Sequence, residues 1–217
     1  MWKILVDYHE GIAFGLLTTL KLAGIAWLGG LVVGTALGFL ASRSAVGDAF
    51  VRSGAFVLSS IPVIIFLFWV HYPLQAALQV VIPPFISASF VLTVLNIGAV
   101  AEIVRNALRT FDPEYVNAGI VCGFSTSQIF RYVQVPIFLR QVIPSVLRTQ
   151  VTILHMTLFA SLISVDEIFR IAQRINAETY KPIEIYTALA LLFLGVSLPL
   201  NVIAAGLERR FHGGLVR

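Results

Sequence analysis

A run of 49 residues without any Asp, Glu, Lys or Arg separates Arg52 from Glu102. As one α-helix, this run would be about 74 Å long, which is more than twice the hydrocarbon thickness of a membrane of about 30 Å. The chain must therefore fold back on itself, and Pro83-Pro84, preceded by Tyr72-Pro73, supplies the break. The pattern predicts two membrane spans, at 53–71 and 85–104.

The rest of the chain is also apolar. Of its 217 residues, 58% are hydrophobic and 12% are charged, whereas about 25% are charged in an ordinary soluble domain. This excludes a water-soluble globule, and a mean hydropathy of +0.91 excludes a disordered chain. Further spans are predicted at 11–41, 143–164 and 185–207. We therefore expect an all-α membrane protein with five transmembrane helices in a single domain, 1–217.

Basic residues are distributed unequally between the two sides that these spans define. One side carries Arg43, Arg52, Arg105, Arg109, Arg131, Arg140, Arg148, Arg209, Arg210 and Arg217. The other side carries only Lys3, Arg170, Arg174 and Lys181, while Lys21 lies within the first span. The positive-inside rule then predicts an outside N-terminus and a cytoplasmic C-terminus. The net charge of +4 is explained by this topology and does not indicate nucleic-acid binding.

Small and polar residues within the spans suggest where helices meet. Gly30, Gly34 and Gly38 share one helix face and favour close helix packing, and Pro62 predicts a kink. Glu102 near the inner end of the third span and His155 in the fourth are costly in a membrane. Either residue could face a translocation pathway. Alternatively, Glu102 pairs with Arg105 or Arg109, and His155 is a hydrogen-bonded packing residue.

The predicted cytoplasmic connection at 110–142 is long for a loop between bundled helices, which indicates a function. Asp112 is a good N-cap and Pro113 a good first helical residue, so a short helix is expected from Pro113 to Cys122, ending at Gly123. Ser125 and Gln128 have capping-box spacing and predict a second helix that ends before Pro136. Two short helices joined at a glycine would form a compact knob suited to docking a partner.

The same loop resembles the EAA loop of ATP-binding-cassette importer permeases. In that family, Glu-Ala-Ala is followed after three residues by Gly and after nine more by Ile, any residue, Leu and Pro. Here Asn117-Ala118-Gly119 is followed at the same spacing by Gly123 and then by Val133-Gln134-Val135-Pro136. The resemblance implies that this loop couples the membrane helices to an ATPase. The implied coupling residues are Pro113, Glu114, Tyr115, Val116, Asn117, Ala118, Gly119, Ile120 and Gly123.

The flanking sequences are similar to the polar-amino-acid subfamily of these permeases. The segment 101–105, Ala-Glu-Ile-Val-Arg, resembles the segment that precedes the loop, and 155–161 with Glu167 is similar to a stretch of the fourth span. The subfamily has the same five-span, N-outside topology. The resemblance adds candidate pathway residues, and the full set is His155, Met156, Thr157, Ser161 and Glu102.

An amphipathic helix is predicted at 164–181, on the outer side. Ser164 and Glu167 have capping-box spacing, and Asp166 is spaced for an ion pair with Arg170. Such a helix could lie at the headgroup level. The resemblance implies instead an outer gate element that docks a substrate-binding protein.

Several chemistries have no motif in this chain. The phosphate-binding pattern G-x-x-x-x-G-K-[ST] is absent, so we expect no cofactor here and assign ATP and Mg²⁺ to a partner ATPase. Scattered histidines and a single cysteine predict no metal site and no enzyme activity. We expect a permease subunit of an ATP-driven importer for polar amino acids or related small polar solutes, in the bacterial inner membrane. The alternatives are an ion-coupled secondary transporter and an intramembrane enzyme.

The expected importer contains several other components. Two cytoplasmic ATPase subunits would close on ATP binding and drive alternating access. A second permease, identical or similar, would complete the pathway, and an extracytoplasmic binding protein would deliver the solute. Membrane lipid would surround the whole, and no nucleic acid is involved.

Overall fold

The computed structural model describes residues 6–212, and these residues form helices and no strand. This confirms the all-α fold. The helices, in chain order, are α2 (His9–Gly29), η1 (Gly30–Gly34), α3 (Thr35–Ala41), α4 (Ala45–Ser60), α5 (Val63–His71), α6 (Pro73–Leu78), α7 (Pro84–Arg109), α8 (Pro113–Val121), α9 (Thr126–Ile129), η2 (Phe130–Gln134), α10 (Val135–Met156), η3 (Thr157–Ile163), α11 (Ile168–Thr179) and α12 (Pro182–His212).

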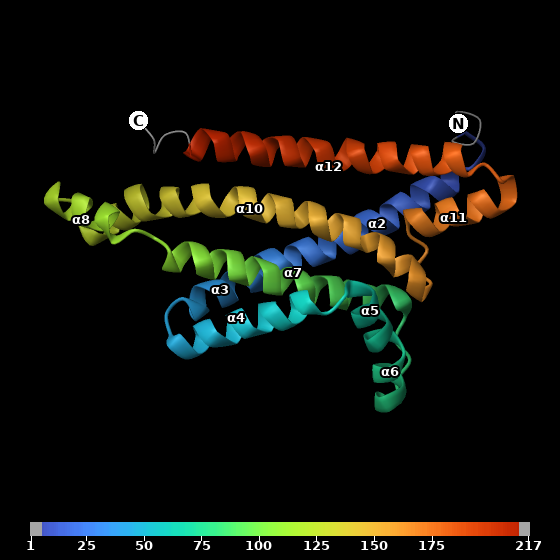
Figure 1. Cartoon of the computed structure of the whole chain (residues 1–217), viewed down its shortest axis with the longest axis horizontal. Helices are drawn as coiled ribbons and strands as arrows, with labels where there is room; N and C mark the ends of the chain where they lie inside the picture. Colours follow the sequence, from blue (N-terminus) through green and yellow to red (C-terminus); the bar gives the residue numbers. More distant parts are fainter. Residues whose placement is uncertain (1–5, 213–217) are drawn as a thin grey trace.

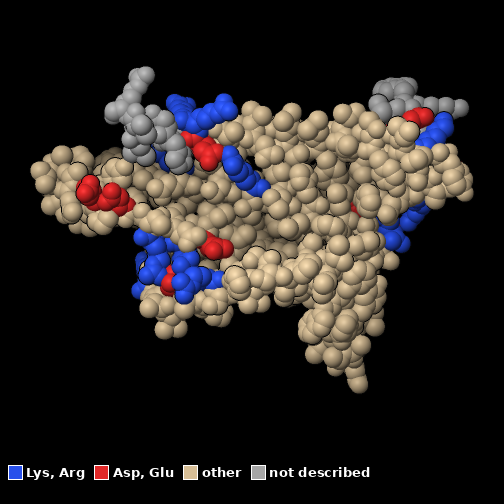
Figure 2. Space-filling view, viewed as in Figure 1, with Lys and Arg blue, Asp and Glu red and all other residues tan. Residues whose placement is uncertain are grey.

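Four helical stretches are long and apolar enough to cross a membrane. They are His9–Ala41, Pro84–Arg109, Thr126–Ile163 and Pro182–Arg210. A fifth crossing requires α4 to be combined with α5 and α6, which are bent away from it by 93°. Figure 2 shows that charged residues gather at the two ends of the visible face and leave its middle uncharged, as expected for a bundle surrounded by lipid.

Helix α7 is the centre of the bundle, with α2, η1, α3, α4, α5 and α10 packed around it (Figure 1). The predicted glycine stripe makes one of these contacts. A Cβ atom on Gly38 would lie 2.6 Å from the carbonyl oxygen of Ala101, and one on Gly34 would lie 2.9 Å from that of Ile97. Because no Cβ atom fits at such distances, the glycines allow η1 and α3 to approach α7 closely.

A buried polar network fixes three of the helices to one another. Asn96 on α7 donates hydrogen bonds to the Ala26 carbonyl oxygen and to Gln150 Oε1, both at 2.9 Å. Trp27 Nε1 donates to the Gln150 carbonyl oxygen at 3.0 Å. Buried polar groups are stable only when they are hydrogen-bonded, so this network sets the relative positions of α2, α7 and α10.

The span predicted at 53–71 is not one straight helix. Its helix breaks at Ile61 and Pro62, where α4 ends and α5 begins at a steep angle. Pro62 has no amide hydrogen to continue the helix, and it holds the preceding Ile61 in an extended conformation, with φ −90° and ψ 121°. The kink that was predicted at Pro62 is therefore a complete change of direction.

The second helix of the predicted loop does not end before Pro136. It continues through η2 into α10, so one helical stretch runs from Thr126 to Ile163 and the loop boundary at 142 lies inside a helix. The turn that precedes Pro136 is π-helical. A wider turn relieves the clash between a proline ring and the carbonyl four residues earlier, which lets the helix pass through the proline.

Candidate functional site

The predicted coupling helix is α8, and local hydrogen bonds define both of its ends. The Asp112 carboxylate accepts from the Glu114 amide at 2.9 Å. At the other end, Gly123 has a φ of +77°, and the Phe124 amide donates to the Gly119 carbonyl oxygen at 3.0 Å. A left-handed residue just beyond a helix is a common way to end it, and glycine adopts this conformation without strain.

The turn after Gly123 leads directly into the next helix. The Ser125 amide donates to Gln128 Oε1 at 2.8 Å, and the Gln128 amide donates to Ser125 Oγ at 3.4 Å. This is the predicted capping box, and it fixes the start of α9.

One face of α8 packs on the chain and the other is bare. Gly119 lies against Ile129, so close that an added Cβ atom would be 3.0 Å from Ile129 Cγ1. Tyr115 and Val116 are half-buried, and the Tyr115 ring is 6.0 Å from that of Phe111. The predicted coupling residues that are exposed are Pro113, Glu114, Asn117, Ala118, Ile120 and Gly123. Helix α8 therefore presents a bare surface at one end of the bundle (Figure 1).

A cavity of about 360 Å³ lies between α4, α5, α7 and α10. Glu102 and Met156, two of the predicted pathway residues, both line it. The other lining residues are Ala55, Leu58, Ser59, Ile61, Pro62, Val63, Leu95, Gly98, Ala99, Thr149, Thr152 and Ile153. A single carboxylate thus stands among mostly apolar walls.

Glu102 does not pair with the neighbouring arginines, so that alternative is wrong. Both Arg105 and Arg109 contact Asp48 Oδ1 on α4, and Arg105 Nη1 also donates to Asn106 Oδ1 at 2.7 Å. Glu102 has no hydrogen bond or ion pair with any residue in the described part of the chain. Its carboxylate is available to a group that enters the cavity.

The other three predicted pathway residues lie elsewhere. Thr157 and Ser161 are buried, and their hydroxyl groups donate to the carbonyl oxygens of Leu154 and Leu158 in their own helix, both at 2.7 Å. His155 is exposed and lies edge-on to the Phe193 ring of α12, at 5.9 Å between centroids. The structure therefore brings two of the five residues together at the cavity.

Besides Ser59 of α4, sequence reasoning missed two polar residues of the cavity wall. Thr149 and Thr152 of α10 line it with Met156, and each hydroxyl donates to the carbonyl oxygen four residues earlier, at 3.1 and 3.2 Å. The three residues are spaced by three and four positions, which is the period of one helix face. Thr152 and Thr149 lie four and seven positions before Met156, so this helical spacing could have identified both threonines from the sequence.

The amphipathic helix that was predicted at 164–181 is α11, but Ser164 is not its N-cap. Ser164 has a φ of 71° and ends η3, whereas Glu167 caps α11 by accepting from the amides of Phe169 and Arg170 at 2.9 and 2.8 Å. Glu167 is fully buried, and its burial raises the pKa of the carboxyl to about 7. The predicted ion pair is present, with Arg170 Nε 3.0 Å from Asp166 Oδ1.

The chain matches, over residues 30–213, the family of binding-protein-dependent transport system inner membrane components. It belongs to this family. It is therefore an inner membrane protein and the permease component of an ATP-binding-cassette importer, in which ATP hydrolysis resides in separate subunits. The family places this component beside those ATPase subunits and a second permease.

Individual relatives and structures agree with this assignment. The glutamine transport system permease protein GlnP of Escherichia coli strain K12 is 30% identical over 199 residues, which cover 88% of this chain and 89% of that protein. The histidine/lysine/arginine/ornithine permease protein HisQ of the same strain is 22% identical over 225 residues, covering 99% of both. A solved amino acid ABC transporter with histidines has the same fold, with a TM-score of 0.81, 24% identity and coverage of 95% of this chain and 96% of that chain.

Proposed function

We propose that this permease moves polar amino acids across the inner membrane by alternating access, driven by ATPase subunits that dock on α8. The observation that carries the proposal is one continuous helical stretch, Thr126–Ile163. It begins where α8 packs on α9 through Gly119 and Ile129. It then passes the cavity, to which it contributes Thr149, Thr152 and Met156.

This connection provides a mechanical path from the docking surface to the cavity. A helix transmits displacement along its axis because its backbone hydrogen bonds resist stretching, and packed interfaces move as units. When two cytoplasmic ATPases close on ATP and Mg²⁺, which those subunits hold, α8 would move with them and α10 would follow. The wall of the cavity on α10 would then shift relative to α4, α5 and α7.

The cavity has the chemistry to receive an amino acid. Its walls are mostly apolar, and the unpaired Glu102 carboxylate can accept from the ammonium group that every free amino acid carries. The relatives GlnP and HisQ are named for the transport of glutamine and of histidine, lysine, arginine and ornithine, which supports polar amino acids as the substrate class.

The remaining components follow the same mechanism. An extracytoplasmic binding protein would deliver the solute on the side of α11, and a second permease would close the pathway. The exposed leucines and valines of α12 suit contact with membrane lipid. The ion-coupled alternative has no comparable support, because the family and its relatives are ATP-driven importers.

Purification of the chain from membranes in mild detergent tests the coupling. We expect an ATPase subunit to remain bound, with vanadate-sensitive hydrolysis that a binding protein loaded with solute stimulates. A stable chain without an ATPase would contradict the proposal.

In proteoliposomes of the complex, Glu102→Gln should lower uptake about tenfold or more, the loss typical of one charge-assisted hydrogen bond. The exposed Glu10→Gln is the matched control and should transport normally.

A further inference from the structure

A second cavity, of about 460 Å³, lies between the ends of α3 and α7 and the turn that leads from η2 into α10. We call it the phenylalanine pocket, because phenylalanine is its most frequent lining residue. The pocket is lined by Phe39, Leu108, Phe111, Phe130, Gln134, Val135, Phe138 and Leu139. It shares no lining residue with the cavity that contains Glu102, so the site described above does not account for it.

The pocket lies where membrane spans end. Phe39 and Leu108 are within the last turn of two candidate spans, which end at Ala41 and Arg109. Figure 1 shows the end of α7 and the start of α10 on the side of α8. The pocket therefore lies near the border between the hydrocarbon and the headgroups of a membrane. A soluble subunit would meet the chain only beyond these last turns.

The walls of the pocket favour an apolar occupant. Its volume corresponds to about 15 water molecules, but all lining side chains except Gln134 are apolar and offer water no hydrogen bond. Phe39, Phe130 and Leu139 are also exposed, so the pocket is open to what surrounds the bundle. At this depth the surroundings are lipid, and an acyl chain is the apolar group that is always at hand.

A cation without a counter-ion stands beside the pocket. Arg43 Cζ is 4.4 Å from the centre of the Phe39 ring, and within residues 6–212 its guanidinium has no hydrogen bond or ion pair. The side chain of Gln134 has no hydrogen bond in the same part of the chain. A guanidinium binds phosphate through charge-assisted hydrogen bonds, and an amide can donate to an ester carbonyl. The pocket and these two groups fit an amphiphile with a negative head.

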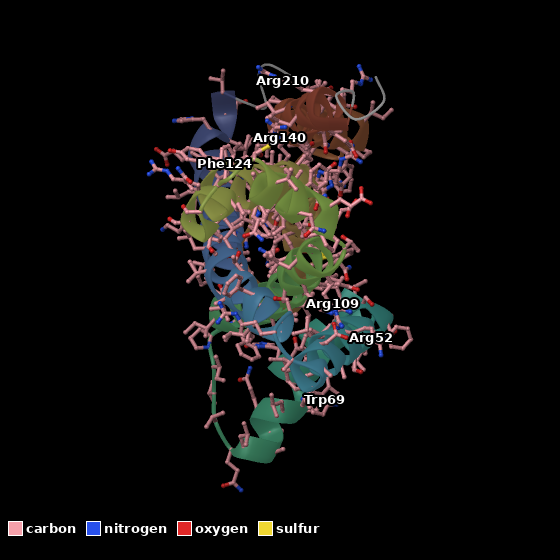
Figure 3. The ribbon with its side chains drawn as sticks, turned by 90° about the vertical axis from the view of Figure 1, so that its left-hand side faces the viewer. Arg52, Trp69, Arg109, Phe124, Arg140 and Arg210 are labelled. Atoms are coloured by element: carbon pink, nitrogen blue, oxygen red, sulfur yellow. The ribbon has the colours of Figure 1, made fainter. Side chains whose placement is uncertain are left out.

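The charges around the pocket favour an anionic headgroup over a zwitterionic one. Arg131 and Arg140 directly follow two of the lining residues, and Arg140 is labelled in Figure 3. Asp112 also follows a lining residue, but its carboxylate accepts from the Glu114 amide at the start of α8. Basic residues at the membrane surface attract anionic lipids.

We infer that the phenylalanine pocket binds an anionic phospholipid, with an acyl chain among the phenylalanine rings and the phosphate on Arg43. Because the pocket joins α3 and α7 to η2 and α10, the bound lipid would hold the start of the long helical stretch against the rest of the bundle. The site lies outside the proposed pathway, and its occupancy does not depend on which solute is transported.

Lipid binding to the purified transporter complex in mild detergent tests the inference. Native mass spectrometry compares palmitoyl-oleoyl phosphatidylglycerol with palmitoyl-oleoyl phosphatidylcholine, which has the same chains and no net charge. We expect phosphatidylglycerol to bind more tightly. Arg43→Gln should lower its affinity about fivefold, the loss typical of one arginine at an anionic surface. The matched control is Arg52→Gln, an exposed position on α4, which does not line the pocket and should bind normally. Equal affinities for the two lipids, or equal losses in the two variants, would overturn the inference.

A second variant tests the acyl chain. Val135→Trp fills the pocket and should lower the binding of both lipids, whereas Val202→Trp on α12, at a 60% exposed position, should not. Normal binding in Val135→Trp would overturn the inference. So would displacement of phosphatidylglycerol by inorganic phosphate, which would show that the site takes phosphate without chains. Arg43→Gln changes an exposed side chain, so it decides the matter if Val135→Trp does not assemble.

Photo-crosslinking in membranes shows what occupies the pocket in the whole transporter. The photoreactive residue p-benzoyl-phenylalanine replaces Leu139, which is 43% exposed. We expect adducts with the mass of phosphatidylglycerol, and fewer of them when Arg43→Gln is present. Crosslinks to an ATPase subunit or to a second permease would show that a protein covers the pocket, and the inference would fail.

Discussion

Gly123 is the residue on which the shape of the proposed coupling region depends most. Its φ of +77° costs about 1–2 kcal/mol for a residue with a side chain, and more for a β-branched one. A Cβ atom there would meet no neighbour within 4 Å, so the cost arises from the backbone alone. We expect Gly123→Val to lower ATP-coupled uptake about fivefold or more, and Gly123→Asn to lower it much less, because Asn tolerates this conformation. Uptake in proteoliposomes at equal protein levels measures this.

The control for this series is Gly195→Val. Gly195 lies in α12 and also has open space around it, but its backbone is helical, so uptake should not change. Equal losses at both positions would mean that added bulk, and not the turn, is responsible.

Glu167 makes the stability of the region around the start of α11 depend on pH. Burial raises the pKa of its carboxyl from an ordinary 4.5 to about 7, so the folded chain keeps this proton to a higher pH than the unfolded chain does. The stabilising contribution is therefore complete below pH 4.5 and is lost as the pH rises to about 7, by at most about 3 kcal/mol.

Glu167→Gln removes this titration and should flatten the pH dependence. We expect the difference in melting temperature between the wild-type protein and the variant to change across pH 4.5 to 8, as followed by tryptophan fluorescence in detergent. Glu10→Gln, an exposed position, should keep the wild-type profile. An unchanged profile in Glu167→Gln would show that this carboxyl does not titrate in that range.

At the scale of elements, η1 and α3 contact α7 closely because Gly34 and Gly38 have no side chains. Gly38→Val would place a Cβ atom 2.6 Å from the Ala101 carbonyl oxygen, which forces the two helices apart. Overpacking of this kind costs about 3 kcal/mol. Thermal unfolding in detergent should show a clear loss of stability. Gly24→Val in α2, where an added Cβ meets nothing within 4 Å, should change stability by less than about 1 kcal/mol. Equal melting temperatures for the two variants would contradict the assignment.

The caps of α8 and α9 depend on near neighbours in the sequence and were predictable, but the same spacing failed at α11, where the N-cap is Glu167 and not Ser164. The caps of α8 and α9 are hydrogen bonds between residues two or three positions apart, so Asp112 and the Ser125–Gln128 pair predict them directly. The direction of the chain after Pro62 was not predictable in the same way. A proline indicates that a helix is interrupted, but the angle depends on how α5 packs on α7 and η3.

In the candidate site too, features set by the local sequence were predictable and contacts with distant residues were not. Glu102 was found because a charge within an apolar span is conspicuous, but the partner of Arg105 was missed because Asp48 lies 57 residues away. Thr157 and Ser161 match a family pattern, yet their hydroxyl groups bond to their own helix. A sequence match indicates that a position is important and does not say which way its side chain faces.

At the scale of the whole molecule, most of the basic residues and the proposed docking surface of α8 lie at the same end. Helix α8 lies at the end where α3 turns into α4 (Figure 1). Arg109, labelled in Figure 3, contacts Asp48 near the start of α4. Helices α6 and α11 lie toward the other end (Figure 1). If the positive-inside rule orients this chain, α8 faces the cytoplasm, where the ATPases are.

Cys122 tests this orientation, because it is the single cysteine of the chain and is exposed at the end of α8. A membrane-impermeant maleimide should not label it in intact spheroplasts and should label it after permeabilisation. In a Cys122→Ser background, Tyr180→Cys, between α11 and α12, should label without permeabilisation. The reversed pattern would place α8 outside, where no ATPase could reach it, and the coupling mechanism would fail. Bound ATPase should also slow labelling of Cys122 in opened membranes, because docking on α8 covers it, and this links the topology to the function in one experiment.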